Sequence, residues 1–209
     1  GYCPGPVVIL SGGCIPALLP HITRHRGHKV VMVMTESPYE DERQIEQADG
    51  VDAVVLNDPT NIDQFLAANP NTIYLPHCYD PDLHYPGVSD FKADCVFVGT
   101  GFPSRVEFMQ RVDWTGIDLG LAGNWRHVPD DLARHVVHDL EDCMPGERTP
   151  DLYRGALTSF NLYRTEAQRD DLSEGWAMGP REVELAATGC WFARQSRPAG
   201  DELFPMLPI

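Results

Sequence analysis

The chain has 209 residues, of which 43% are hydrophobic and 22% are charged, and its net charge is −15. An acidic surface repels a phosphate backbone at long range, so we expect no general nucleic-acid binding. The sequence holds no apolar run of about 18 residues, so we expect no membrane span. Six scattered cysteines without zinc-type spacing predict a reduced, cytoplasmic protein with neither disulfides nor a metal site.

The first part of the chain alternates between strand and helix patterns. The β-branched and Met-rich run at 29–35, KVVMVMT, is typical of a strand buried on both faces. Turn residues and Pro or Gly separate the segments. The pattern predicts strands at 6–10, 29–35, 52–56 and 71–75, and helices that end near 26, 48 and 68.

Residues 76–91 hold three prolines and show no periodicity, which predicts a linker or a long loop. Alternation then resumes, with strands predicted at 93–98, 117–122, 157–163 and 190–194, and helices at 103–112, 129–142, 151–156 and 180–188. We therefore predict an α/β protein with two doubly wound Rossmann-like domains, 1–89 and 90–209. Such domains bind ligands at the carboxyl ends of their strands, and a cleft between two of them is a common ligand site.

The segment GTGFPSR, which begins at Gly99, follows a predicted strand and opens a predicted helix. Gly99 and Gly101 would let backbone amides approach a phosphate, and Arg105 in the first helical turn suits an anionic ligand. The next strand ends at Asn124 rather than at an acidic residue, so NAD binding is not supported. An ordinary strand-to-helix turn is the alternative.

Three further side chains follow predicted strands. Glu36 is a candidate base or hydroxyl-binding group, and His77 is a second candidate base. Arg164 ends the run FNLYR and could match a phosphate with its guanidinium group. The alternative for Glu36 is a solvated helix start. For His77 it is a capping or core histidine, and for Arg164 it is a surface arginine.

The segment GPREVELAATG, from Gly179, reads as a helix that stops at Gly189. Arg181 and Glu184 are three residues apart and so lie on one face of that helix. A carboxylate can accept two hydroxyl hydrogen bonds from a ribose, while an arginine one turn away meets phosphates. A solvated helix face with a local ion pair is the alternative.

This R-x-x-E-x-x-x-x-G pattern resembles a segment of the GT-B glycosyltransferases, in particular the CgeB-like (spore maturation protein CgeB) group. Further segments occur in an order similar to that group and span nearly the whole chain: TESPYEDERQ, YLPHCYDPDLHYP, DCVFVGTGFPSR, LAGNW and FNLYR. Many relatives in that group occur in bacteria and in phages of GC-rich actinobacteria, which fits this chain's preference for arginine over lysine, since only Lys29 and Lys92 are lysines.

The resemblance implies two Rossmann-like domains facing a cleft, with the acceptor on the first domain and the nucleotide sugar on the second. It implies no cofactor and no metal, so arginines and helix ends would meet the phosphate charge. The acceptor would be a hydroxyl group of a glycan, a protein or a modified base. The residues expected to bind the donor are Gly99, Gly101, Arg105, Asn124, Arg164, Arg181 and Glu184, and the catalytic candidates are Glu36 and His77.

Some features depart from the family pattern. The retaining signature E-x7-E would place its first acid at Trp176, so the stereochemical outcome stays open. Relatives carry more sequence before the first strand, so we expect that the first domain is incomplete. Two alternatives also stay open: a GT-B-fold nucleotide-sugar epimerase, and a nucleotide-sugar-binding module without catalysis.

Overall fold

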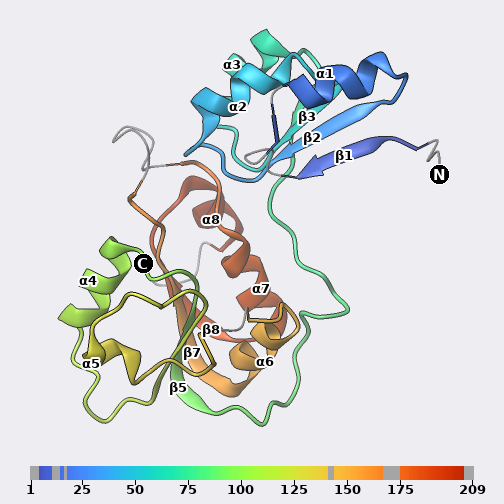
Figure 1. The fold of residues 1–209 in the computed structure, drawn as a ribbon. Helices are drawn as coiled ribbons and strands as arrows, with labels where there is room; N and C mark the ends of the chain where they lie inside the picture. Colours follow the sequence, from blue (N-terminus) through green and yellow to red (C-terminus); the bar gives the residue numbers. More distant parts are fainter. Residues whose placement is uncertain (1–4, 11–14, 17, 141–143, 167–174, 205–209) are drawn as a thin grey trace. The chain divides into compact units, whose positions relative to one another are not determined.

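The structure is a computed structural model that describes residues 5–10, 15–16, 18–140, 144–166 and 175–204. These residues form an α/β protein with two parallel four-stranded sheets, compatible with Rossmann-like units (Figure 1). Apart from those gaps, unit 1 contains 5–76, 175–177 and 197–199, and unit 2 contains 77–166, 178–196 and 200–204. The sequence interpretation placed the division after residue 89, whereas these units divide after Pro76.

Unit 1 is built around a sheet whose strands follow one another in sequence order, β1-β2-β3-β4. A right-handed connection between parallel strands places each helix on the same face when the order never reverses. Figure 1 shows this arrangement. The elements are β1 (Val7–Leu10), α1 (Leu18–His25), β2 (Val30–Met34), α2 (Asp41–Ala48), β3 (Ala53–Leu56), α3 (Ile62–Ala68) and β4 (Thr72–Tyr74).

The core of unit 1 lies between this sheet and its helices. Met32, Val54 and Leu56 of the strands pack with Phe65 of α3 and with Ala48 of α2, and all five are fully buried. The prediction of double winding is therefore wrong for the described part of unit 1, because its strand order does not reverse.

A short segment from late in the sequence completes unit 1. Asp58, which follows β3 and is buried, accepts hydrogen bonds from the amide of Thr60 at 2.8 Å and from the amide of Ala177 at 2.8 Å. Arg197 donates to the carbonyl of Gly175 at 2.5 Å. Gly175 is required here, since a Cβ at that position would lie 2.5 Å from Asp58 Oδ2.

Unit 2 has the strand order β6-β5-β7-β8, so the chain reverses direction after β6. The elements assigned to this part of the chain are β5 (Ala93–Val98), α4 (Pro103–Arg111), β6 (Leu119–Ala122), α5 (Asp130–Ala133), α6 (Arg148–Gly155), β7 (Ala156–Asn161), α7 (Pro180–Thr188), β8 (Trp191–Arg194) and α8 (Pro198–Leu203). The helix predicted at 129–142 is wrong for residues 134–140, because Val136 pairs in parallel with Leu121, and residues 141–142 lie outside the described residues.

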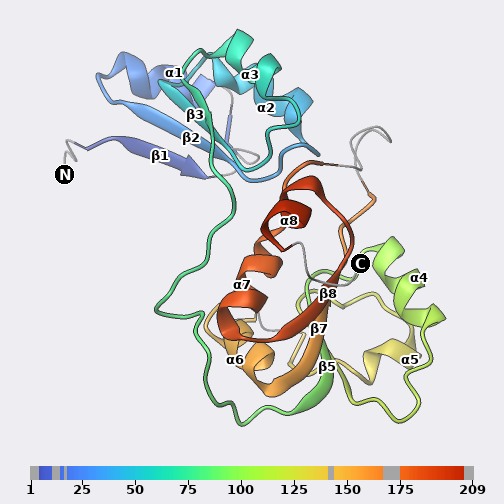
Figure 2. The same ribbon diagram turned by 180° about the vertical axis from the view of Figure 1, so that it is seen from behind.

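The reversal places helices on both faces of this sheet (Figure 2). One apolar cluster joins Phe97 and Leu121 to Met109 of α4, and a second joins Val96 to Leu152 of α6 and to Leu185 of α7. Unit 2 is therefore doubly wound, as predicted. None of the helices within the described residues is long and apolar enough to cross a membrane.

The contacts of Asp58 predict that Asp58→Ala destabilises unit 1 by about 1–3 kcal/mol, because the buried amide of Ala177 and the partly buried amide of Thr60 lose their acceptor. Hydrogen exchange at the Ala177 amide should accelerate most, since that amide donates to Asp58 Oδ2. The control is Asp63→Ala, which changes an exposed aspartate on α3 of the same unit. Equal exchange rates at Ala177 in parent and Asp58→Ala would contradict the assignment.

Candidate functional site

The carboxyl ends of β5 and β7 form the topological switch point of unit 2. β5 pairs with β6 along one edge and with β7 along the other, so the loops that follow β5 and β7 leave in opposite directions. Open parallel sheets bind ligands at such a point. The predicted donor residues Gly99, Gly101, Arg105, Arg164 and Arg181 come from these two loops and from the helices α4 and α7.

Two aromatic rings bring three arginines together there. The guanidinium carbons of Arg181 and Arg105 lie 4.7 Å and 5.4 Å from the centre of the Phe97 ring. Those of Arg105 and Arg164 lie 5.2 Å and 5.7 Å from the centre of the Phe102 ring. We refer to Arg105, Arg164 and Arg181 as the arginine cluster. It concentrates positive charge in a chain whose net charge is −15.

Arg105 connects the two loops of the switch point. It is buried, and its Nε and Nη2 donate to the carbonyl of Leu162 at 3.1 Å and 2.7 Å. Its Nη1 donates to the carbonyl of Thr100 at 3.0 Å. The guanidinium group thus fixes the loop after β7 against the loop after β5, and its predicted contact with a donor phosphate stays a prediction.

Arg181 is held at the end of β5. Its Nε donates to the carbonyl of Val98 at 2.7 Å, and its Nη1 donates to the side-chain oxygen of Asn161. A Cβ at Gly99 would lie 2.5 Å from Arg181 Nη2. Gly99 is therefore needed to make room for the guanidinium group of the protein itself.

The second glycine of the GTG turn also serves internal packing. A Cβ at Gly101 would lie 2.6 Å from the Trp125 indole. The Gly101 amide donates to the carbonyl of Asn124 at 2.9 Å, while the Asn124 residue is exposed. This packing supports the alternative of an ordinary strand-to-helix turn for Gly101, and a donor contact of Asn124 stays a prediction.

A carboxylate of the protein lies at the start of α4. Glu166 accepts hydrogen bonds from the amide of Ser104 at 2.7 Å and from its hydroxyl at 3.0 Å. Burial raises the pKa of Glu166, but the hydrogen bonds from Ser104 and Thr165 outweigh it and hold that pKa below its ordinary value. Sequence reasoning missed Glu166, because 62 residues separate it from Ser104.

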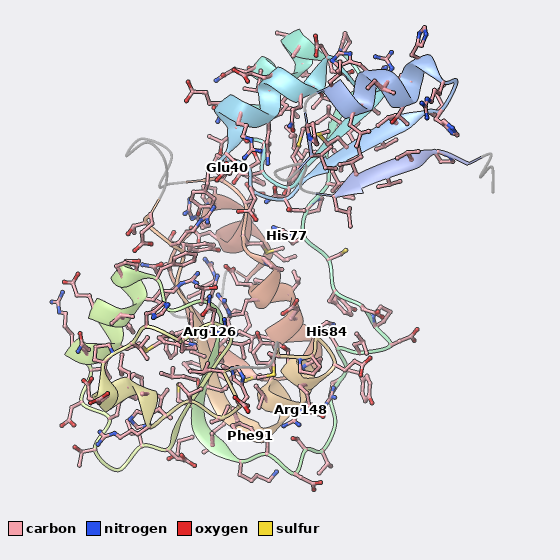
Figure 3. The ribbon with its side chains drawn as sticks, viewed as in Figure 1. Glu40, His77, His84, Phe91, Arg126 and Arg148 are labelled. Atoms are coloured by element: carbon pink, nitrogen blue, oxygen red, sulfur yellow. The ribbon has the colours of Figure 1, made fainter. Side chains whose placement is uncertain are left out.

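Glu184 faces the segment that follows unit 1. Its Oε1 lies 4.0 Å from His84 Nε2, and its side chain is 25% exposed. Burial raises the pKa of Glu184, while the charges of His84 and Arg181 lower it. Figure 3 labels His84, which the sequence analysis did not single out.

The position of His84 follows from a local turn and from an anchor on α6. The His84 amide donates to the carbonyl of Asp80 at 2.7 Å, and Asp80 Oδ1 accepts the amide of Asp82 at 2.9 Å. Arg154 of α6 donates to the carbonyl of Leu83 at 3.0 Å. The Asp80/Asp82 pair thus forms a turn, and this turn presents His84 to Glu184.

The two candidate bases lie in different units. Glu36 follows β2 in unit 1 and is partly buried. His77 follows β4, is partly buried and is the first residue of unit 2 (Figure 3). Both follow strands of the sheet of unit 1, as expected, and their catalytic roles stay predictions.

A hollow of about 540 Å³ opens beside the switch point, between α4 and the end of β7. Its volume is in the range of small-molecule sites. It is lined by Ser104, Arg105, Glu107, Phe108, Arg111, Val112, Leu162, Tyr163, Thr165 and Gln195. Arg105 belongs to both the hollow and the arginine cluster, so a ligand at the switch point could extend into this space.

Comparisons with protein-family models and with curated proteins find no match for this chain.

The burial of Glu184 predicts how Glu184→Gln changes stability with pH. Below about pH 4.5, the ordinary pKa of a glutamic acid, the carboxyl is protonated in both folded and unfolded chains, so variant and parent should be equally stable. As pH rises through the raised folded-state pKa, the parent must ionise a half-buried carboxyl and loses stability relative to the variant. Denaturant unfolding from pH 4 to pH 8 measures the difference.

The control is Glu107→Gln. The Glu107 side chain is 75% exposed, so this variant should gain no stability over the parent as pH rises. A Glu184→Gln variant that is less stable than the parent at pH 8 would contradict the burial argument.

Proposed function

We propose that this protein is a glycosyltransferase that moves a sugar from a nucleotide-sugar donor to a hydroxyl group of an acceptor. Units 2 and 1 would be the donor and acceptor domains of a GT-B enzyme. The observation that carries the proposal is the arginine cluster at the switch point of unit 2, with Glu184 one helical turn beyond Arg181.

The cluster suits a diphosphate for reasons of charge and shape. Guanidinium groups are planar and match phosphate oxygens better than ammonium groups do. In transfer, the acceptor oxygen bonds to the anomeric carbon, and the bond from that carbon to the diphosphate breaks. The leaving diphosphate gains negative charge, which fixed positive groups at the switch point would stabilise. Arg164 and Arg181 are the residues that we propose for this role.

Glu184 is proposed to hold the ribose of the donor. An ionised carboxylate accepts hydrogen bonds from two neighbouring hydroxyls. The imidazole of His84 has its Nε2 4.0 Å from Glu184 Oε1, beyond ordinary hydrogen-bond distance. A ribose hydroxyl would therefore compete with water, and not with an existing short bond to His84.

A general base would take the proton of the acceptor hydroxyl if the reaction inverts the anomeric carbon. Glu36 is the first choice because of its place after β2, and His77 is the second because its ordinary pKa is near 6.5. A retaining reaction would not need this base.

The first test is binding to a panel of UDP, GDP, TDP and their sugars, followed by calorimetry with the best nucleotide and its nucleoside. Arg164→Ala and Arg181→Ala should weaken the nucleoside diphosphate about tenfold or more and leave the nucleoside unchanged, because charge-assisted bonds to phosphate are lost. Glu184→Gln should weaken both ligands by about 1–3 kcal/mol.

Several outcomes would redirect the proposal. Equal losses for both ligands in Arg181→Ala would assign that arginine to the fold alone. Turnover of a nucleotide sugar without an acceptor favours the epimerase, and tight donor binding without turnover favours a binding module. Absence of binding across the whole panel would overturn the function.

The candidate bases are tested by replacement in the intact protein, with transfer and donor binding measured separately. Glu36→Gln should slow transfer by about 10²–10⁴-fold, as loss of a general base does, without changing donor affinity. His77→Gln is the matched comparison. If the transfer rate of Glu36→Gln stays within about threefold of that of the parent, Glu36 is not the base. If neither replacement slows transfer, neither Glu36 nor His77 is the base.

A further inference from the structure

A buried glutamate lies next to Arg181 on α7. Glu182 is 0% exposed, and its Oε1 accepts a hydrogen bond from Asn161 Nδ2 at 2.7 Å and another from the hydroxyl of Tyr163. Both partners come from β7 and the loop after it. Glu182 thus faces the end of β7, while its neighbour Arg181 reaches the end of β5.

A buried arginine, which also pairs with Asp201, lies beside the second oxygen of Glu182. Arg194 of β8 places its Nε 3.8 Å from Glu182 Oε2, and its side chain is 1% exposed. Burial raises the pKa of Glu182 above its ordinary value, although the bonds from Tyr163 and Asn161 and the charge of Arg194 lower it in part. The two hydrogen bonds to Oε1 make that oxygen an acceptor.

This restriction decides the orientation of Asn161. Oε1 of Glu182 accepts from both Asn161 and Tyr163, so the NH₂ group of Asn161 must face Glu182. The amide oxygen of Asn161 then points the other way, and there it accepts the bond from Arg181 Nη1. Asn161 is 2% exposed, so water does not compete readily for either end.

We propose that Glu182 is a positioning residue which, through Asn161, holds the guanidinium group of Arg181 at the switch point for a diphosphate ligand. The chain of contacts runs from Glu182 to Asn161, to Arg181 and to the carbonyl of Val98. This role rests on the proposed function, because the position of Arg181 matters for binding only if a diphosphate binds at the switch point.

Simple electrostatics predicts the opposite effect of removing Glu182. Glu182→Gln deletes a negative charge beside the arginine cluster, which by charge alone should strengthen anion binding. A positioning role predicts weaker binding, since Gln can donate or accept and no longer fixes the Asn161 amide. Stronger anion binding in Glu182→Gln would therefore indicate the charge effect alone, and weaker binding would indicate the positioning role.

The experiment is calorimetric titration of the full chain with inorganic pyrophosphate, a probe that does not depend on the unknown base. Glu182→Gln should weaken pyrophosphate about tenfold, within the range of couplings between contacting residues. Asn161→Ala should cause a similar loss while leaving Glu182 and Arg194 paired. The control is Glu147→Gln, which removes the same charge from an exposed residue of unit 2 that does not line the hollow.

A double-variant comparison separates positioning from general damage. In an Arg181→Ala background, Glu182→Gln should cause no further loss of pyrophosphate affinity. Additive losses, unchanged affinity or stronger binding in Glu182→Gln would each overturn the positioning role. Thermal unfolding shows whether the Glu182→Gln variant folds. If it does not fold, the pyrophosphate affinity of Asn161→Ala tests the positioning role instead.

The proposed function can fail separately. If Arg164→Ala and Arg181→Ala weaken pyrophosphate but Glu182→Gln and Asn161→Ala do not, only the positioning role is lost. If the parent binds no pyrophosphate, both proposals are contradicted.

Discussion

The reversal of strand order after β6 is the constraint on which the candidate site depends. It gives β5 a neighbour on each edge and sends the chain to opposite faces of the sheet. Residues from 97 to 105 and from 160 to 166 can then meet at one place, although they are far apart in the sequence. Without the reversal, α4 and α7 would lie on the same face, and Arg105 and Arg181 could not approach Phe97 from their two helices.

The arginine cluster shows how a protein can keep like charges close together. Each guanidinium group stacks on an aromatic ring, and two of them donate to main-chain carbonyls: Arg105 to those of Leu162 and Thr100, and Arg181 to that of Val98. Carbonyl dipoles and ring faces offset the repulsion without cancelling the charge. The groups are therefore fixed before a ligand arrives, which is the arrangement that electrostatic stabilisation of a transition state requires.

The sequence predicted the alternation of strands and helices well, because buried parallel strands are apolar throughout and are bounded by Gly, Pro and Asn. It overextended one helix at 129–142, where the run HVVH contributes Val136 as a strand-like partner of Leu121. It also predicted double winding in both halves, although periodicity identifies strands and not their order. Only unit 2 shows the reversal in its described residues.

The side-chain partners of the site were less accessible to sequence reasoning. Gly99 and Gly101 suggested an approaching phosphate, but Arg181 and Trp125 take the space beside them. A missing Cβ admits any close neighbour, and the sequence does not say which one. Glu166 and His84 were missed for a similar reason, since their partners Ser104 and Glu184 are close in space and distant in the chain.

Glu182 and Glu184 show how two identical residues on one helix come to differ. Glu182 is fully enclosed, with Asn161 and Tyr163 bonded to one oxygen and Arg194 beside the other. Glu184 keeps a quarter of its side-chain surface exposed, and its Oε1 lies 4.0 Å from His84 Nε2. Burial raises the pKa of both carboxyls, but Glu182 has hydrogen bonds to one oxygen and a cation beside the other, whereas Glu184 keeps an accessible carboxyl. Two residues along a helix correspond to a rotation of about 200°. One glutamate therefore faces the sheet, where we propose that it positions Arg181, and the other faces the segment of His84, where we propose that a ribose binds.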